Sequence, residues 1–197
     1  MGEPLKDIDV RRAAHSRLLH HARRCPDTLV IDELGLDHGA CRIDIAVING
    51  HIRGLEIKAE ADTLGRLPQQ VVAYGNVVDK ATLIVAHRHL QAALPMIPGW
   101  WGVIAAGRGA HDGIKFRRIR SECVNRDVDP LMVARLLWRP EIVTLLRSRG
   151  HAERELRAPR EILYERLAAE MPRRALTHAV REILKRRAIW RDRPRPS

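Results

Sequence analysis

Two neighbouring segments near the start of the chain alternate polar and branched apolar residues, which is the pattern of half-buried β-strands. Residues 42–48 and 51–58 carry this pattern, and Asn49-Gly50 lies between them. Asn-Gly between two such segments is a strong short-range signal for a β-hairpin. The pattern therefore predicts a hairpin over residues 42–58.

Helical and strand patterns surround this hairpin. Apolar residues at helical spacing predict a first helix over residues 7–24, which Pro26 ends. Pro68 favours the start of a main helix that runs to about residue 78. The remaining predicted elements are a strand over 28–34, a Gly-rich loop over 35–39, strands over 81–86 and 100–106, a short helix over 90–96, and an edge strand over 114–119.

From Pro130 onward the pattern is helical, with predicted helices over 131–138, 140–149, 160–170 and 174–190. The last two helices, joined at Met171-Pro172, suit either a helix-turn-helix reader or simple packing. Residues 191–197 predict a disordered basic tail. We therefore predict a mixed α/β core over 1–129 and a basic all-helical extension over 130–197.

The length of the hairpin loop decides which side chains share a face of the sheet. A two-residue loop would place Asp44 and Glu56 on opposite faces, because a slip of one residue turns every side chain over. A three-residue loop, with Gly50 in a left-handed conformation, brings Asp44, Glu56 and Lys58 together. We predict the three-residue loop. Two carboxylates and a lysine on an apolar sheet are costly to bury unless a divalent cation lies between them.

Asp44, followed by Glu56-Ile57-Lys58 on the next strand, resembles the signature of the PD-(D/E)XK nuclease superfamily. Residues 62–64 (Asp-Thr-Leu), 66–67 (Arg-Leu) and Gln70-x-x-x-Tyr74 are similar to a family of small, largely uncharacterised bacterial proteins in that superfamily. One departure is that Arg42-Ile43 replace the leading proline position. The resemblance implies a restriction-endonuclease-like αβββαβ core with a mixed sheet, and the predicted order of elements agrees with it.

The resemblance also implies a metal-dependent nuclease that hydrolyses phosphodiester bonds, with DNA as the favoured substrate in repair, processing or defence. Its catalytic residues are expected to be Asp44, Glu56 and Lys58. Mg²⁺ or Mn²⁺ is expected on Asp44, Glu56, the Ile57 carbonyl and Glu33, because hard cations prefer oxygen ligands. Glu33 could instead end its strand at the solvent edge.

Gln70, Tyr74 and Arg66 are the expected substrate-binding residues. Gln70 and Tyr74 are four residues apart on the predicted main helix, so they project from one face. They could contact phosphate or base beside the metal, or form a partly buried polar pair. Arg66 could meet a phosphate or pair with Asp62.

The distribution of positive charge along the chain indicates nucleic acid as a partner. The chain of 197 residues carries a formal charge of +11, and residues 131–197 hold 17 Lys and Arg against 8 Asp and Glu. A basic segment is typical of a nucleic-acid binder, although it could also be a solvated helical surface. The alternative function is therefore a non-catalytic nucleic-acid-binding or regulatory protein that uses these helices on a nuclease-like scaffold. The sequence also leaves open whether the protein forms a homodimer.

Cysteine usage and hydropathy argue against several other classes of protein. Three Cys without C-x-x-C spacing do not indicate a disulfide framework, a zinc knuckle or an iron–sulfur cluster. No apolar segment approaches the length of a membrane span, and residues 1–6 lack the apolar stretch of a signal peptide. The sequence thus predicts a cytoplasmic protein that makes no membrane contact.

Overall fold

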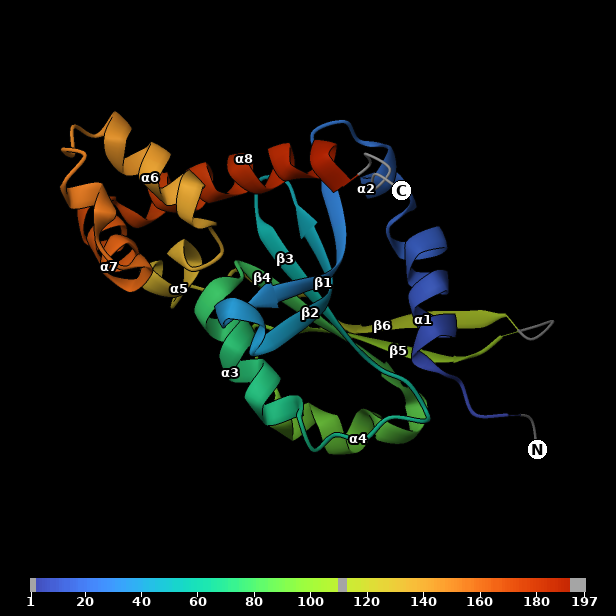
Figure 1. The fold of residues 1–197 in the computed structure, drawn as a ribbon. Coiled ribbons are helices and arrows are strands. Elements are labelled where there is room, and N and C mark those ends of the chain that lie inside the picture. Colours follow the sequence, from blue (N-terminus) through green and yellow to red (C-terminus); the bar gives the residue numbers. More distant parts are fainter. Residues whose placement is uncertain (1–2, 110–112, 192–197) are drawn as a thin grey trace.

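A computed structural model describes residues 3–109 and 113–191, with side chains described as far as residue 187. The protein is a mixed α/β fold built on a six-stranded mixed sheet (Figure 1), as the sequence predicted. The strands lie in chain order; β1 to β3 are antiparallel, β3 to β5 are parallel, and β6 returns antiparallel at the edge. They are β1 (Leu29–Leu36), β2 (Cys41–Ile48), β3 (Ile52–Lys58), β4 (Lys80–Ala86), β5 (Gly102–Arg108) and β6 (Ile114–Arg120).

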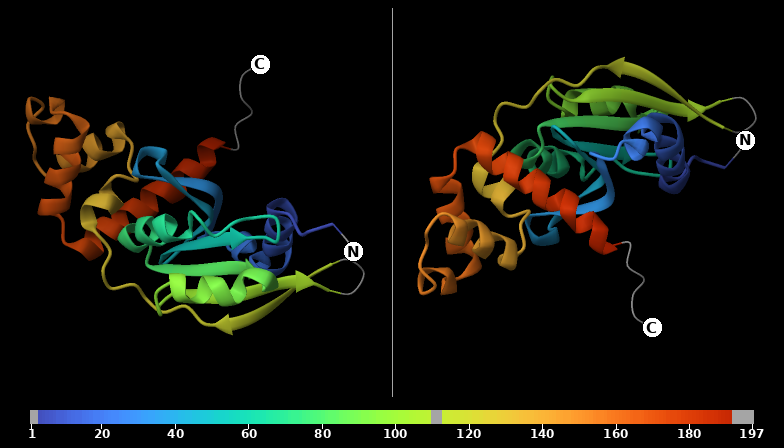
Figure 2. Two further views of the ribbon diagram at one scale, coloured as in Figure 1. Left: turned by 90° about the horizontal axis from the view of Figure 1, so that it is seen from below. Right: turned by 90° about the horizontal axis from the view of Figure 1, so that it is seen from above.

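Helices cover both faces of the sheet (Figures 1 and 2). On one face lie α1 (Asp7–Ala13), a π-helical turn (Ala14–Leu18) and α2 (His20–Arg24). On the other lie α3 (Leu67–Val77) and α4 (Leu90–Ala93), which make the crossovers between the parallel strands. The C-terminal helices are α5 (Pro130–Ala134), α6 (Arg139–Ser148), α7 (Arg160–Glu170) and α8 (Arg173–Arg191).

Two apolar clusters, one on each face, hold these layers together. The smaller cluster joins Val10 and Ala14 of the N-terminal helical segment to Leu55 and Ile57 of β3. The larger one joins the opposite face of the sheet to α3 and continues without a break into α5–α8. Because Leu176, Val180 and Leu184 of α8 belong to this larger cluster, the C-terminal helices are part of the core. A boundary between two parts at residue 130 stays a prediction.

The hairpin has the predicted register. Ile48 pairs with Ile52 and Ile45 with Leu55, so residues 49–51 form a three-residue loop. The prediction for Gly50 was wrong, because its φ lies outside the left-handed region. Asn49 closes the turn instead: its side-chain Oδ1 accepts from the His51 amide at 3.2 Å, and its own amide donates to the His51 carbonyl at 3.1 Å.

Several element boundaries differ from the sequence-based expectation. The first helix is interrupted by the π-helical turn, and β1 continues to Leu36, which takes up the first two residues of the expected loop. The helix expected over 131–138 ends at Ala134, and Trp138 begins the next helix as its N-terminal flanking residue. Residues 192–197 of the predicted tail lie outside the described residues.

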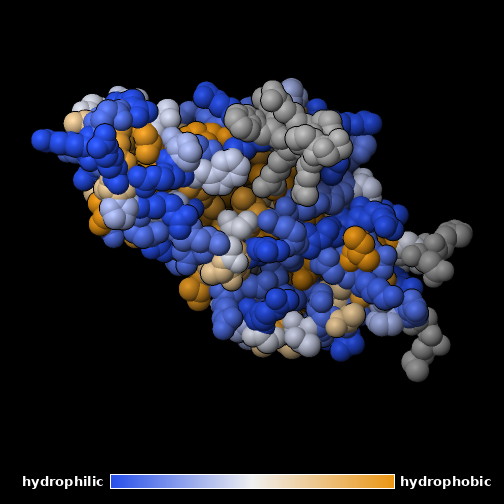
Figure 3. All heavy atoms as spheres, viewed as in Figure 1, coloured by the Kyte–Doolittle hydropathy of each residue, from blue (hydrophilic) through white to orange (hydrophobic). Residues whose placement is uncertain are grey.

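The face shown in Figure 3 is mostly hydrophilic, with small separate apolar patches. None of the helices within the described ranges has the length and apolar character needed to cross a membrane.

Candidate active site

A cleft of about 570 Å³ opens beside the β2–β3 hairpin. Its floor contains Asp44 of β2 and the β3 residues Glu56, Ile57 and Lys58. One wall comes from the end of the β1–β2 connection, residues 39–42, and the other from the segment that leads into α3 and its first turn. Helix α1 contributes Asp7 and Arg11. The three-residue loop therefore brings the predicted catalytic residues to one cleft.

Glu56 is the most buried charged group in the cleft. Its side chain is 1% exposed, and both carboxylate oxygens are occupied. Oε1 accepts from Lys58 Nζ at 2.6 Å, and Oε2 accepts from the Tyr74 hydroxyl at 2.6 Å. Gln70 Oε1 accepts a second bond from Lys58 Nζ at 2.9 Å. A buried carboxylate and amine are thus held together with charge-assisted bonds, which a buried pair needs to offset its lost hydration.

Asp44 lies at the same floor but in a different electrostatic situation. Its Oδ2 accepts from the Ile57 amide at 2.7 Å, and its Oδ1 lies 3.4 Å from Arg11 Nη2. Burial raises the pKa of Asp44 to about 7, and the negative charge of Glu56 adds to the rise. A bound cation would be stabilised at Asp44, because it would offset the nearby negative charge of Glu56.

Tyr74 of α3 lies behind the cleft. It is fully buried, and its hydroxyl donates to Glu56 and accepts from the Asp44 amide at 3.3 Å. Burial raises the pKa of Tyr74 well above its usual value, so the hydroxyl keeps its proton and remains a donor. The expectation that Tyr74 contacts substrate is corrected here. Its ring is covered by core residues, so it supports Glu56 from behind.

Gly54 of β3 allows Tyr74 to take this position. A Cβ built on Gly54 would lie 2.8 Å from Tyr74 Cε1 and 3.3 Å from Ile43 Cγ2. We expect Gly54→Ala to lower the free energy of unfolding by about 1–3 kcal/mol, because added carbon in a packed core forces its neighbours apart. The Tyr74–Glu56 bond should weaken with it. Urea denaturation measures the effect.

Gly75→Ala is the matched control for this substitution. Gly75 follows Tyr74 in α3, and a Cβ built there meets nothing within 4 Å. Alanine is favoured over glycine inside a helix by roughly 0.5–1 kcal/mol, so this variant should be at least as stable as wild type. Equal stability of both variants would mean that Gly54 is not required for the Tyr74 position.

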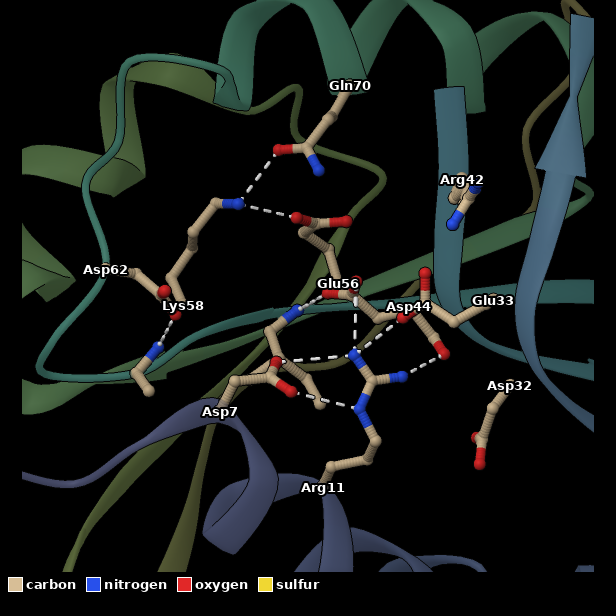
Figure 4. Close-up of polar contacts among 12 residues, drawn as sticks. Asp7, Arg11, Asp32, Glu33, Arg42, Asp44, Glu56, Lys58, Asp62 and Gln70 are labelled. Carbon is tan, nitrogen blue, oxygen red and sulfur yellow. Dashed lines mark hydrogen bonds and ion pairs between the residues drawn. The ribbon is translucent and has the colours of Figure 1, made fainter. Parts of the chain in front are cut away.

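The two acidic residues of β1 point to different sites. Asp32 Oδ1 is bonded to His15 Nε2 at 2.8 Å, whereas Glu33 lines the cleft and pairs with Arg11 at 3.0 Å (Figure 4). Glu33 has a φ of 57°, a left-handed conformation that is strained for a residue with a side chain. This conformation directs Glu33 toward the cleft. It contacts Arg11 there, and no contact joins it to Glu56.

The walls carry the substrate-binding candidates. Arg66 and Gln70 both line the cleft, and Arg66 is exposed. The alternative partner of Arg66, Asp62, accepts from the Ala59 amide at 2.8 Å. On the opposite wall lies Arg42, which is also exposed. Sequence reasoning did not identify Arg42 or Arg11 as site residues. Arg42 is two residues from Asp44 on β2, so strand alternation could have found it. Arg11 reaches the cleft only through the packing of α1 against the sheet.

The carboxylate oxygens of Asp44 and Glu56 are of the type that a small hard cation prefers, but they are fewer than the sequence predicted. In residues 3–109 and 113–191, no three His, Cys, Asp or Glu side chains form a group that could hold a metal ion. The expected set of three carboxylates is therefore not assembled. Mg²⁺, however, usually keeps several waters and binds through one or two carboxylates plus substrate oxygens. Asp44 and Glu56, with the Ile57 carbonyl beside them, meet that smaller requirement.

Comparison with known proteins identifies relatives of the whole chain. A family model described as bacteriophage P4 protein cII matches residues 13–192. One curated relative is "Protein cII" of Enterobacteria phage P4, which is 23% identical over 150 residues. The match covers 76% of this chain and 56% of the relative, so it spans little more than half of that protein's length. No solved structure gives a significant match.

Proposed function

The chain belongs to the bacteriophage P4 protein cII family, and we propose that it is a metal-dependent nuclease acting at the β2–β3 cleft. The observation that carries the proposal is the hairpin register, which places Asp44, Glu56 and Lys58 together in one cleft with Gln70 on its wall. The order α1, β1, β2, β3, α3, β4 supports a restriction-endonuclease-like core. The favoured substrate is DNA.

Asp44 and Glu56, with the Ile57 carbonyl, would hold Mg²⁺ or Mn²⁺. When bound, such an ion polarises the phosphoryl oxygen and lowers the pKa of a water ligand. The family's printed name states no activity, so the case for this chemistry rests on the cleft itself.

Lys58 has a definite role in this proposal. An ammonium group has three N–H donors, and two of them are bonded to Glu56 and Gln70. Among the described residues no further acceptor is bonded to Nζ, and the third donor would orient the attacking water or stabilise negative charge that develops on the phosphate. Glu56 and Gln70 therefore fix the direction of Lys58, and Tyr74 in turn fixes Glu56. The four side chains form one connected support for the reacting group.

The exposed arginines of the two walls would bind the phosphate backbone. Arg42 and Arg66 both line the cleft that Asp44 and Glu56 line, and both are exposed. An arginine binds phosphate with its planar fork of N–H donors, which suits a strand that lies between two such residues. This arrangement would hold a phosphodiester over Asp44 and Glu56 despite their negative charge.

The alternative function places nucleic acid on the C-terminal helices instead. Three of the basic residues there form ion pairs with acidic residues in the loops beside the sheet. Such pairs neutralise the charge locally and leave less of it to attract a polyanion. They are Arg135–Asp37 at 2.9 Å, Arg181–Asp79 at 3.8 Å and Lys185–Asp27 at 2.7 Å.

Charge substitution distinguishes the two surfaces. We expect Arg42→Gln with Arg66→Gln to weaken binding of labelled DNA and to reduce the slope of log K against log salt by roughly 1–2, because each lost phosphate contact removes one released counterion. Arg154→Gln with Arg157→Gln, in the exposed connection between α6 and α7, is the matched control and should leave the slope unchanged. The reverse pattern would favour the C-terminal helices as the binding surface.

A further inference from the structure

Arg11 of α1 occupies a central position among the acidic residues of the cleft (Figure 4). Its Nε lies 3.0 Å from Asp7 Oδ1, and its Nη2 lies 3.0 Å from Glu33 Oε1 and 3.4 Å from Asp44 Oδ1. Its Nη1 donates to the Asp44 carbonyl at 2.5 Å. The side chain is only 14% exposed. One guanidinium thus neutralises carboxylates from α1, β1 and β2.

The surrounding backbone is arranged to produce this contact. Val10 and Ala14 are buried against the sheet, which fixes the rotation of α1 and directs Arg11 toward β2. Asp7 lies one turn before Arg11 on the same helix face, where it can hold the guanidinium. Glu33 reaches Arg11 from a left-handed conformation that residues with side chains rarely adopt. Strain of this kind persists where the surrounding structure imposes it, and it gathers at functional sites.

Arg11 does not have the freedom expected of a substrate-binding arginine. Its guanidinium nitrogens are already bonded to Asp7, Glu33 and Asp44, so few donors remain for a phosphate. Arg42 and Arg66, in contrast, are exposed on the walls. The position of Arg11, next to Asp44 at the floor, is instead the position of a counter-ion.

We propose that Arg11 is a resident counter-ion of the cleft that a divalent cation must displace from Asp44. This inference rests on the proposed metal-dependent function. A guanidinium and a divalent ion that share a carboxylate repel each other strongly at such distances, so the two are expected to compete. Metal entry is then coupled to release of Arg11 from Asp44 and Glu33. By thermodynamic reciprocity, any change that weakens the Arg11 contacts strengthens metal binding.

The test is a direct titration of Mn²⁺ into the purified full chain without nucleic acid. Arg11→Met keeps most of the aliphatic side chain and removes the charge. We expect this variant to bind Mn²⁺ about 5- to 150-fold more tightly than wild type, the usual range of coupling between competing ligands. Its metal-free melting temperature should fall, since three carboxylates lose their counter-ion, and Mn²⁺ should restore it.

Two further variants keep the test decisive. Asp7→Asn removes the anchor of Arg11 without touching Asp44 or Glu33, so it should also tighten Mn²⁺ binding, even if Arg11→Met does not fold. Arg12→Met is the control. Arg12 is the exposed neighbour of Arg11 and does not line this cleft, and its loss should leave Mn²⁺ affinity unchanged.

The opposite results overturn the inference in separable ways. If wild type binds Mn²⁺ and both Arg11→Met and Asp7→Asn bind it equally or more weakly, Arg11 positions Asp44 for the metal and does not compete with it. The proposed nuclease function survives that outcome. If neither wild type nor the variants bind Mn²⁺, both the competition and the metal-dependent function fail together.

Discussion

Replacing Asp44 with asparagine is expected to reduce metal-dependent DNA cleavage by at least about 100-fold, while the metal-free protein melts at a higher temperature than wild type. Asparagine keeps an oxygen that can accept from the Ile57 amide, which Asp44 does at 2.7 Å. It removes a charge whose ionisation is opposed by burial and by Glu56, the two causes that raise the pKa of Asp44 to about 7. Removal of the Asp44 charge should therefore lower activity and increase the stability of the folded state.

The stability gain should depend on pH in a defined direction. The folded pKa of Asp44 lies above its ordinary value of 3.8, so ionisation destabilises the fold as pH rises toward 7. Asparagine should therefore add little stability near pH 4 and the most above pH 7, on the order of a few kcal/mol. Thermal melts of both proteins across this range measure the difference.

Asp32→Asn is the control for this substitution. Asp32 lies on β1, bonds to His15 and does not line the cleft. The variant should cleave DNA at the wild-type rate. Mg²⁺ should raise the melting temperature of wild type and Asp32→Asn, but not that of Asp44→Asn. The account is contradicted if Asp44→Asn melts well below wild type and still cleaves DNA.

Glu56→Ala should have the largest effect on stability, a loss of about 3–5 kcal/mol. Glu56 differs from Asp44 in its surroundings, because it is paired with the buried amine of Lys58. The amine of Lys58 is 5% exposed and is bonded to Glu56 at 2.6 Å, so the alanine variant leaves a buried positive charge without its anion. The Tyr74 hydroxyl also loses its acceptor. For a domain of this size the melting temperature should fall by roughly 6–20 °C.

Two companion variants identify the cause. Glu56→Gln keeps one oxygen that accepts from Lys58 Nζ, and its amide nitrogen can donate to the Tyr74 hydroxyl once that hydroxyl turns, so the variant should fold with a smaller loss while remaining inactive. In the double variant Glu56→Ala with Lys58→Met, the stranded charge is gone, and its loss of stability should be smaller than the sum of the two single losses. Additive losses would show that the Glu56–Lys58 pair is not what the alanine substitution disrupts.

The hairpin and the side chains that share its cleft-facing side could be predicted from the sequence because both depend on local rules. Alternation with period two fixes which residues of β3 share a face, and a three-residue loop is the loop that places Asp44 on the same face as Glu56 and Lys58. The prediction of a left-handed conformation for Gly50 was wrong, also for a local reason. The side chain of Asn49 satisfies the His51 amide, so the turn closes without a left-handed glycine.

The supporting residues could not be predicted in the same way because their contacts are tertiary. Arg11 becomes part of the cleft only after Val10 and Ala14 dock α1 on the sheet. Tyr74 was identified through a motif, but its burial depends on Gly54, twenty residues earlier in the chain. The left-handed Glu33 has no sequence signal, since glycine and asparagine are the residues that usually mark such a conformation.

The sequence-based hypothesis that the C-terminal segment binds nucleic acid rested on its total charge alone. Counting residues cannot tell a surface arginine from one that forms an ion pair with the core. Lys185 contacts Asp27 before β1, and Arg181 contacts Asp79 before β4. These partners are more than 100 residues away in the chain, so only the folded arrangement reveals that the charge helps to attach α8.

The central claim is that the β2–β3 cleft hydrolyses phosphodiester bonds in a metal-dependent reaction. The most direct measurement is cleavage of end-labelled single-stranded, duplex and branched DNA by the purified chain, with Mg²⁺, with Mn²⁺ and with EDTA, beside the Lys58→Met variant. We expect the wild-type protein to cleave at least one of these substrates. This cleavage should require the divalent ion, and its rate should fall by roughly 100-fold or more in Lys58→Met. Cleavage that is equal in the two proteins, or none on any substrate with either ion, would contradict the central claim.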